Sequence, residues 1–438
     1  MKIRWQPYPE YKNSGVNWLG EIPAHWEARR LKHAAPEIGS KLSKKPDELP
    51  YLGLENIESG TGCLMLDNAV ESVESTVIRF EKGDVLFGKL RPYLAKVVHA
   101  DFDGVGTTEL LVLRPNEGVD SRFLFYCLLS DGFIETVNGL TYGTKMPRAN
   151  SEQVGHLRIG IPPLPEQRAI AAFLDRQTAR LDALIAEQRR LIELLQERRA
   201  ALISRAVTRG LDPDAPLKDT GIPWLGEIPA HWEVKRLKFV ANVQTGVAKG
   251  RNLKSKETIE VPYLRVANVQ SGFVDLSDVA TITIGKDELK RYSLQVGDIL
   301  MTEGGDYDKL GRGTVWEGQV ASCIHQNHIF AVRVHQGVNP YWISLITQAD
   351  YARHYFILRS KQTTNLASIS ATNIGEFPVI LPPSEEQRAI AAYLDRETAK
   401  IDAAIVEIET SIARLEEYRT ALIAAAVTGK IDVRCNAL

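Results

Sequence analysis

The sequence predicts an α+β fold that occurs twice in one chain, with two β-rich domains separated by two long helices. The first observation is that the ten residues 18–27 recur unchanged at 224–233. The second is that residues 165–210 match residues 385–430 at 26 of 46 positions. The third is that short strand-like runs fill the stretches between these repeats. A match of this length indicates an internal duplication, and the duplication predicts one architecture made twice.

The repeats also give the order of the domains. The chain has 438 residues, which exceeds one ordinary domain of ~150 residues. The near-constant segments suggest one structural task carried out twice, whereas the diverged blocks suggest two different targets. The predicted segments are a first variable domain (1–161), a first long helix (162–210), a second variable domain (211–381), a second long helix (382–430) and a tail (431–438).

Composition excludes several classes of protein. Hydrophobic residues make up 44% and charged residues 25%, as in ordinary globular proteins, so a disordered or collagen-like chain is excluded. No apolar run reaches the ~18 to 20 residues of a membrane helix, and the first residues lack the apolar core of a signal peptide. The cysteines form no CxxC pair, which favours a reducing cytoplasm over a disulfide framework; they are Cys63, Cys127, Cys323 and Cys435.

Each near-constant segment has the composition of a long helix. Residues 166–209 and 385–428 contain neither glycine nor proline and are rich in Ala, Leu, Glu, Gln and Arg. A helix of ~44 residues would be roughly 66 Å long. A proline pair precedes each segment, and Gly210 and Gly429 provide suitable C-terminal stops.

Both helices carry apolar residues at alternating steps of four and three, which is a heptad seam. A single helix of this length is marginal in water, so each seam needs a partner. We expect the two helices to pair antiparallel, which would relate the two domains by a pseudo-two-fold axis; two helices buried in an ordinary core are the alternative. The predicted seam residues are Leu174, Leu181, Ile185, Ile192, Leu195, Leu202, Leu394, Ile401, Ile405, Ile408, Ile412, Leu415 and Leu422.

The variable domains read as β-rich. Short runs of β-branched and aromatic residues alternate with turn signals such as the Gly-Gly-Asp at 304–306. Short helices are predicted at 122–129 and 341–351. The predicted strands include 85–87, 110–113, 261–266, 280–284 and 329–334.

The sequence contains no GxGxxG after a strand, no P-loop and no GxSxG. Residues 339–342, Asn-Pro-Tyr-Trp, resemble a methyltransferase tetrapeptide, but the second proline is missing. Cys323, His325 and His328 lack a second ligand pair, so we expect no metal site there. Asp306 and Asp308 could belong to a metal-dependent nuclease, although the first domain has no matching acidic cluster.

The remaining polar residues have the character of nucleic-acid readers. Arg, Lys, Asn, Gln, Thr and Tyr in glycine-containing loops suit phosphate anchoring and hydrogen bonding to base edges. Residues 28–161 hold 16 basic and 18 acidic residues, and residues 234–381 hold 17 and 13, so binding must rest on local patches. The predicted DNA-binding residues are Lys41, Lys44, Lys45, Lys89, Arg91, Tyr93, Lys96, Thr144, Lys145, Arg148, Lys249, Arg251, Lys254, Asp306, Tyr307, Lys309, Arg312, Gln326, Asn327, His328 and Lys361.

At this point the sequence resembles the DNA-specificity subunit of type I restriction-modification systems. The resemblance covers nearly the whole chain. It rests on the two proline-led helix starts (162–168 and 382–388) and on the repeated Trp-Leu-Gly-Glu-Ile-Pro-Ala-His-Trp. Residues 303–313 and 323–328 are also similar to one recurrent type of target-recognition domain in that family.

The resemblance implies a non-catalytic chain whose two domains each read one half of a bipartite, asymmetric site in double-stranded DNA. It implies that the helices set the spacing and dock two methyltransferase subunits, which bind S-adenosylmethionine. Restriction endonuclease subunits that use ATP and magnesium could join the complex. A coiled-coil adaptor without DNA binding, or a nuclease at Asp306 and Asp308, are the alternatives.

Overall fold

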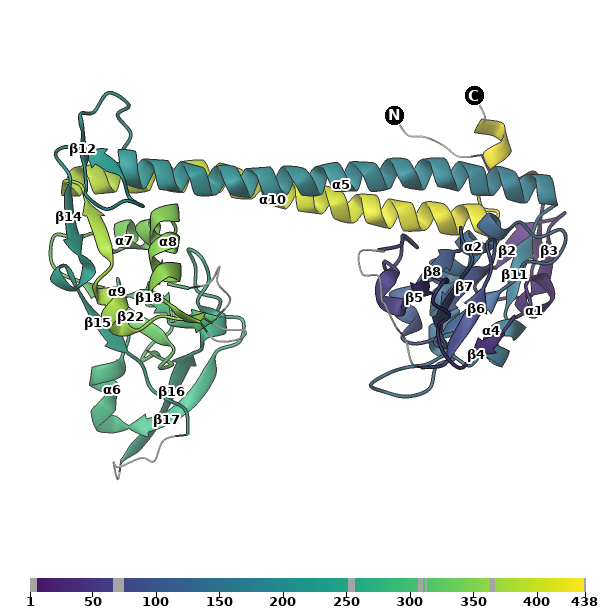
Figure 1. Ribbon diagram of the computed structural model, residues 1–438, viewed down its shortest axis with the longest axis horizontal. Helices are drawn as coiled ribbons and strands as arrows, with labels where there is room; N and C mark the ends of the chain where they lie inside the picture. The colour runs from purple at the N-terminus through teal and green to yellow at the C-terminus, as the bar shows by residue number, and fades with distance from the viewer. Residues whose placement is uncertain are drawn as a thin grey trace. The chain divides into compact units, whose positions relative to one another are not determined.

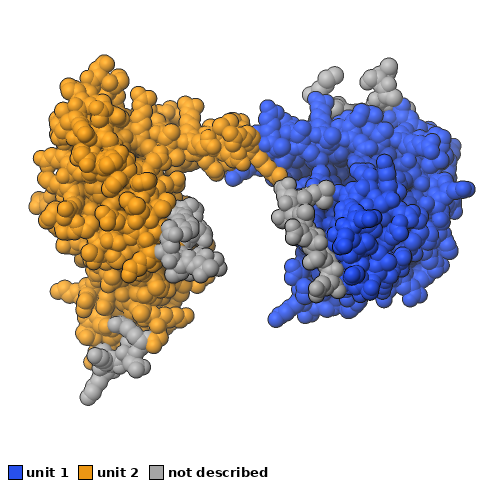
Figure 2. All heavy atoms as spheres, in the orientation of Figure 1, with its two compact units in different colours: residues 1–188, 409–438 blue, residues 189–408 orange. Residues whose placement is uncertain are grey.

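The computed structural model describes most of the chain, which divides into two compact units (Figure 2). Unit 1 comprises residues 1–188 and 409–438, and unit 2 comprises residues 189–408. Each unit therefore contains one β-rich domain and one half of each long helix. The described residues are 6–65, 75–250, 257–305, 310–311, 313–362 and 367–436.

The two long helices are α5 (Leu164–Arg209, 46 residues) and α10 (Ser384–Val427, 44 residues). Each begins directly after its proline pair. Gly210 and Gly429 follow the helix ends with φ of 74° and 71°, in the left-handed region that glycine adopts without strain. A Cβ atom on Gly429 would lie 2.3 Å from Cδ of Pro23, so the close approach also requires glycine.

The helices pair antiparallel within each unit. In unit 1, Arg419 binds Asp182 with an Nε–Oδ1 distance of 2.8 Å, and Gln188 donates to Ser411 at 3.1 Å. Residue numbers thus rise along α5 while they fall along α10. In unit 2, Nε of Arg199 lies 3.0 Å from Oδ1 of Asp402. Figure 1 shows α5 and α10 running side by side. The prediction of two long antiparallel helices is confirmed.

The heptad pattern matches the burial along both helices. All thirteen predicted seam residues are buried or half-buried, from Leu174 and Leu394 at 0% exposure to the half-buried Leu195 and Leu415. Along the middle of the helices, apolar residues outside the pattern include exposed ones, such as Leu184 at 40% and Val406 at 60%, whereas others near the helix ends, such as Ile170 and Ile390, are buried in the domain cores. This is the burial that a helix–helix seam requires.

Unit 1 contains a four-stranded sheet of order β4-β6-β9-β5, a three-stranded sheet of order β10-β7-β8, and the pairs β1-β2 and β3-β11. Helix α2 lies between the strands and α5 (Figure 1). Its elements are β1 (Tyr11–Asn13), β2 (Glu21–Pro23), β3 (Glu27–Arg30), α1 (Leu31–Ala34), β4 (Lys41–Leu42), β5 (Tyr51–Leu52), β6 (Val77–Phe80), β7 (Val85–Gly88), β8 (Val97–His99), β9 (Gly104–Thr107), β10 (Leu110–Leu113), α2 (Ser121–Leu129), α3 (Asp131–Gly139), α4 (Ser151–His156) and β11 (Arg158–Ile161).

Unit 2 contains a four-stranded sheet of order β15-β22-β18-β20, two three-stranded sheets, β17-β16-β21 and β19-β24-β23, and the pairs β12-β13 and β14-β25. Its elements are β12 (Leu217–Asp219), β13 (Glu227–Pro229), β14 (Glu233–Arg236), β15 (Ala241–Thr245), β16 (Thr258–Leu264), β17 (Ala280–Gly285), α6 (Lys286–Tyr292), β18 (Ile299–Thr302), β19 (Gly304–Gly305), β20 (Gly313–Val315), β21 (Ile324–His325), β22 (Ile329–Val334), α7 (Pro340–Thr347), α8 (Asp350–Arg359), β23 (Lys361–Gln362), β24 (Ala367–Ser368), α9 (Ala371–Gly375) and β25 (Pro378–Leu381).

The duplication is visible in the packing of both units. Trp26 and Trp232, the last tryptophans of the repeated decapeptide, are both fully buried in the main core of their unit. The buried carboxylate of Asp84 forms two hydrogen bonds with Arg114, and Asp298 does the same with Arg333. The prediction of two β-rich domains with one shared plan is therefore confirmed.

One predicted helix is wrong in detail. We expected a single helix over residues 341–351, but the structure has two, because α7 ends at Thr347 and α8 begins at Asp350. Ala349 between them is extended, with ψ of 153°. The backbone N–H of Asp350, at the break between the two helices, donates to the hydroxyl of Ser204 on α5, which is distant in sequence.

None of the described helices combines the length and the apolar character that crossing a bilayer requires.

Candidate nucleic-acid interface

Two loops of unit 1 are joined into one surface. The loop that follows β7 contains Lys89 and Leu90, and a second loop runs from Tyr142 to Arg148. Leu90 and Tyr142 each form a backbone bridge with Arg148, and Lys89 accepts a hydrogen bond from the N–H of Ala149 at 3.0 Å. The structure therefore brings together basic residues that are more than fifty positions apart in the sequence.

The loop after β7 has an unusual backbone. Arg91 and Ala95 have φ of 51° and 45°, the left-handed region that non-glycine residues rarely adopt. Between them a single 3-10 turn (Pro92–Leu94) presents Tyr93, whose side chain is 52% exposed. Left-handed residues cost of order 1–3 kcal/mol each and are concentrated at functional sites. This turn is thus a candidate reading element.

Two predicted DNA-binding residues are engaged inside the domain. The ammonium of Lys96 donates to the carbonyls of Leu54 at 2.6 Å and Ile57 at 2.9 Å. The guanidinium of Arg148 forms a two-bonded pair with Glu109. Both side chains hold the loops in place, so their cationic groups are less available to a phosphate than the prediction assumed.

The other predicted residues of unit 1 are accessible. Lys41, Lys44, Thr144 and Lys145 are exposed, whereas Lys45 and Arg91 are half-buried. Lys89 is also half-buried. Burial lowers the pKa of Lys89; the nearby carboxylate of Glu37 opposes this shift, and Arg148 and Lys41 add to it.

Exposed apolar side chains accompany this basic surface. In the second loop, Tyr142 is 60% exposed and Met146 is 57% exposed. They resemble the exposed Tyr93 of the first loop in size and exposure. Aromatic and apolar side chains of this kind suit contacts with base faces or methyl groups. The prediction did not include Tyr142 or Met146, because exposure of a large side chain cannot be read from the sequence.

The predicted residues of unit 2 lie around the end of β21. Gln326 and Asn327 are half-buried, and His328 is exposed and bonded through Nδ1 to Glu303 at 2.6 Å. Lys361 is exposed on β23, which pairs through β24 with β19. Lys249 is exposed, and the bridge between Val247 and Gln326 brings its loop to β21.

Part of the predicted site falls outside the described residues. These residues are Arg251, Lys254, Asp306, Tyr307, Lys309 and Arg312, together with Asp308 of the alternative nuclease site. Within the described part, no group of three or more His, Cys, Asp or Glu side chains is arranged to hold a metal ion. His325 is buried, and its Nδ1 bonds the carbonyl of Ile329 at 2.9 Å.

The repeated motifs form a clasp at the start of each long helix, which the sequence did not reveal. In unit 1 the buried carboxylate of Glu166 accepts hydrogen bonds from the Trp26 indole at 2.8 Å and the Tyr8 hydroxyl at 2.7 Å, and contacts His25 Nε2 at 2.8 Å. We name this the Glu166 clasp. The exact recurrence of both motifs was the signal that could have paired them.

The Glu386 clasp of unit 2 repeats this arrangement with fewer donors. The Trp232 indole and His231 Nε2 both bind Oε2 of Glu386, at 3.0 and 2.9 Å. The neighbouring glutamines also act alike. Gln167 accepts from the N–H of Asp120, the N-cap of α2, and Gln387 accepts from Asn339, the N-cap of α7. Each Glu-Gln pair therefore fastens its domain to a long helix.

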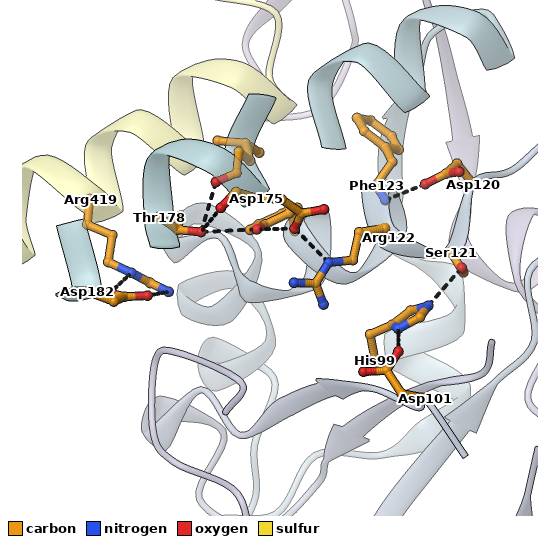
Figure 3. Close-up of polar contacts among 12 residues, drawn as sticks. His99, Asp101, Asp120, Ser121, Arg122, Phe123, Asp175, Thr178, Asp182 and Arg419 are labelled. Carbon is orange, nitrogen blue, oxygen red and sulfur yellow. Dashed lines mark hydrogen bonds and ion pairs between the residues drawn. The ribbon is translucent and has the colours of Figure 1, made fainter. Parts of the chain in front are cut away.

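A second set of polar contacts fixes unit 1 to its helix pair (Figure 3). Arg122 on α2 binds Asp175 on α5 at 2.7 Å, and the Tyr126 hydroxyl donates to the same carboxylate at 2.7 Å. About two turns farther along α5, Asp182 binds Arg419 on α10. The loops of the candidate interface thus belong to a domain that is held rigidly on the helices.

The fold and the site define a class of protein: a duplicated chain in which two different β-rich domains with polar, partly basic loops are each fastened to a pair of long helices. The model of the type I restriction-modification DNA specificity domain matches this chain twice, at residues 35–194 and 229–412. The two matches cover well over half of the 438 residues, so the chain belongs to the family of type I restriction-modification specificity proteins.

Two relatives that match over nearly their whole length are named type I restriction enzyme specificity subunits. The chain is 26% identical over 440 residues to the type I restriction enzyme EcoKI specificity subunit of Escherichia coli (strain K12), covering 95% of this chain and 92% of that one. It is 24% identical to the MjaVIII specificity subunit of Methanocaldococcus jannaschii, covering 99% of each chain. A solved structure from a study of complex assembly and conformational transition in a type I system matches with a TM-score of 0.70 at 21% identity, over 94% of this chain and 99% of that one, and shows the same fold.

Proposed function

We propose that this chain is the sequence-reading subunit of a type I restriction-modification complex, and that each domain reads one half of a bipartite, asymmetric site in double-stranded DNA. The joined loops of unit 1 support this proposal most directly. They combine the exposed Lys145 with the strained turn that presents Tyr93, and the same unit exposes Lys41 and Lys44. Lysines suit phosphates, and side chains at the tip of a rigid turn suit base edges.

The diverged surfaces of the two domains support the asymmetry of the site. Unit 1 presents lysines and tyrosines on loops 89–96 and 141–148, whereas unit 2 presents Gln326, Asn327 and His328 beside β21. Different donors and acceptors select different base pairs in the major groove. Two unlike half-sites follow from two unlike reading surfaces.

Binding to duplex DNA as a function of salt tests the proposal against the adaptor alternative. The complex assembled with its methyltransferase subunits is titrated with a labelled duplex that contains a methylated site from the host genome, at several salt concentrations. We expect the logarithm of the affinity to fall steeply with the logarithm of salt, because phosphate contacts release counterions. Affinity that does not change with salt, or that is equal for a scrambled duplex, would contradict sequence-specific DNA binding.

We further propose that the helices set the spacing between the half-sites and dock two methyltransferase subunits. Leu191 at 45%, Leu194 at 45% and Val406 at 60% exposure lie outside the predicted seam in unit 2, and apolar exposure of this kind marks a protein interface. Leu191→Asp combined with Leu194→Asp should abolish co-purification with the methyltransferase. Glu193→Lys is the charge-changing control on the same turn and should leave co-purification intact.

Under this proposal the chain itself carries out no chemistry. S-adenosylmethionine would be bound by the methyltransferase subunits, and ATP and magnesium by restriction endonuclease subunits where these are present. Incubating the purified chain alone with duplex DNA and magnesium tests this point. Intact DNA is expected, and magnesium-dependent cleavage that Asp306→Asn removes would favour the nuclease alternative.

A further inference from the structure

A cavity of about 640 Å³ lies in unit 2 beside the C-terminal end of α5. Arg205, Arg209 and Gly210 line it from the helix end, and Leu211 from the linker that follows. Tyr393 of α10 closes another side. The lining is therefore partly apolar and partly charged, which is the composition of a binding pocket more than of a packing defect.

The equivalent place in unit 1 shows what such a cavity accommodates. After α10 the chain runs Ile431-Asp432-Val433-Arg434, and after α5 it runs Leu211-Asp212-Pro213-Asp214. In both runs the aspartate accepts a hydrogen bond at 3.0 Å from the backbone N–H two residues later, so both contain the same local turn. Asp214 thus corresponds in sequence position to Arg434 of unit 1.

The same residue also stands at the place of Tyr8. Strand β1 pairs Tyr11 with Pro23, and strand β12 pairs Leu217 with Pro229 in the same register. Counting three residues back from Tyr11 and from Leu217 reaches Tyr8 and Asp214. In unit 2 one acidic residue therefore replaces both a tyrosine and an arginine.

In unit 1 the side chains of Tyr8 and Arg434 fill the place that corresponds to the cavity of unit 2. Tyr8 is 3% exposed and donates to Glu166, and the Arg434 guanidinium lies 5.1 Å from the centre of the Tyr8 ring. Ile431 is 7% exposed and buried beside them. In unit 2 the corresponding Leu211 is 44% exposed, so the linker leaves the space open.

In the Glu386 clasp, one of the two carboxylate oxygens accepts no hydrogen bond from the described residues. The Glu386 side chain is 30% exposed, against 4% for Glu166. Trp232 and His231 both bind Oε2, and Oε1 has no hydrogen-bond partner in the described part of the chain. A Cβ atom on Gly210, which lines the cavity, would lie 3.3 Å from Oε1. The free carboxylate oxygen thus lies beside Gly210, one of the residues that line the cavity.

We propose that this cavity is a docking site for a segment of a partner protein that presents a tyrosine next to an arginine. The tyrosine hydroxyl donates to Oε1 of Glu386, as Tyr8 donates to Glu166. The arginine stacks on that ring and faces the acidic groups of Asp212 and Asp214, a cation–π arrangement like that of Arg434. A second copy of this chain is a poor occupant, because its own Tyr8 is buried in unit 1.

Peptide binding to the full-length chain tests the chemistry of the site. The probe is a fluorescein-labelled synthetic peptide with the sequence of residues 1–13, which contains Arg4, Tyr8 and Tyr11. Saturable binding is expected in fluorescence anisotropy. Replacing the tyrosine at position 8 of the peptide with phenylalanine should weaken binding about tenfold, because one hydrogen bond to a carboxylate is lost.

Substitutions in the chain test whether the peptide binds in this cavity. Leu211→Trp fills the cavity from an exposed position and should abolish binding, whereas Leu184→Trp, on an exposed part of α5 outside the cavity, should leave it unchanged. Glu386→Gln should weaken binding, and the matched Glu166→Gln should not. Circular dichroism verifies that each variant is folded.

Three outcomes would overturn the proposal. They are no binding at millimolar peptide, equal binding by Leu211→Trp and the unsubstituted chain, and self-association of the chain that Leu211→Trp abolishes, which would identify a second copy as the occupant. No DNA and no methyltransferase enter the measurement. Its failure would therefore leave the proposed DNA-reading function untouched.

Discussion

Glu166 and Glu386 occupy equivalent positions at the starts of the two long helices, but their surroundings differ. Glu166 is buried and is bonded by Trp26, Tyr8 and His25, whereas Glu386 is half-buried with two partners on a single oxygen. A buried donor that loses its acceptor costs more than an exposed one, because water cannot replace the bond. Substitutions at Glu166 and Glu386 can therefore be compared directly, because the two positions are equivalent but differ in burial.

Replacing each glutamate with alanine should destabilise the two units unequally. Glu166→Ala leaves the buried Trp26 indole and Tyr8 hydroxyl without an acceptor and should cost about 3 kcal/mol in the free energy of unfolding. Glu386→Ala should cost about 1 kcal/mol, since water can reach that site. Urea unfolding of the two variants measures both values, and equal losses would show that the clasps are equivalent in energy.

Substitutions of Lys96 and Lys145 in unit 1 should have different effects, the first on stability and the second on DNA binding. Lys96→Met removes an ammonium that is bonded to two carbonyls, so it should lower stability by about 1 to 3 kcal/mol. Lys145→Met removes an exposed cation, so it should weaken DNA binding by the complex about equally at all sequences and reduce the salt slope by about 1. A Lys145→Met complex with unchanged affinity and slope would remove this residue from the interface.

Tyr126 should make stability depend on pH in the alkaline range. Burial raises the pKa of Tyr126 to about 12, and the hydrogen bond to Asp175 adds to the effect while the bond with Thr178 opposes it. The unfolded side chain ionises near pH 10. Stability is therefore fully present below pH 10 and is lost as the pH rises towards 12, by about 1 kcal/mol at pH 11. Tyr126→Phe should show a smaller loss between pH 9 and 11 in urea unfolding; an identical loss would assign the effect to other groups.

At the scale of elements, one ion pair joins α5 to α10 within each unit, and the two ion pairs differ in burial. The side chain of Arg419 is 8% exposed, binds Asp182 and donates to the carbonyl of Gly60 at 2.9 Å. Arg199 is 28% exposed and binds Asp402, which is 51% exposed. Buried pairs lose several kcal/mol when one partner is removed, whereas exposed pairs contribute little.

Alanine substitutions of these arginines should differ accordingly. Arg419→Ala leaves the Gly60 carbonyl and Asp182, which is 34% exposed, unpaired and should cost about 2 kcal/mol. Arg199→Ala should cost less than about 1 kcal/mol. Thermal unfolding followed at 222 nm reports the two losses. A small effect of Arg419→Ala would mean that apolar packing alone holds the helices in unit 1.

The sequence predicted elements that depend on local pattern and missed contacts that depend on the fold. The heptads and the absence of glycine and proline predicted α5 and α10 almost to the residue. The break after Thr347 was missed because it is occupied by Ser204, far away in sequence. Lys96 and Arg148 were predicted as DNA contacts because their type and loops suit phosphates, and only the folded chain shows carbonyls and Glu109 beside them.

At the scale of the whole molecule, the duplication separates what is kept from what diverges. The clasps, the Glu-Gln pairs and the long helices are present in both units, and the loops with Tyr93 and with His328 are not equivalent. A chain built this way keeps its attachment constant, and under the proposed function each reading surface could change independently. We therefore expect exchange of one variable domain for that of a relative to alter one half-site only.

Genome-wide mapping of methylated bases tests the central claim most directly. The host strain, and a strain in which one heptad is inserted near Glu193 and another near Glu407, are compared. We expect one asymmetric motif with two unlike halves in the host. With both heptads inserted, each helix lengthens by ~10 Å, and the same halves should be separated by about three more base pairs. A single continuous motif, or a gap that stays unchanged while methylation continues, would contradict it.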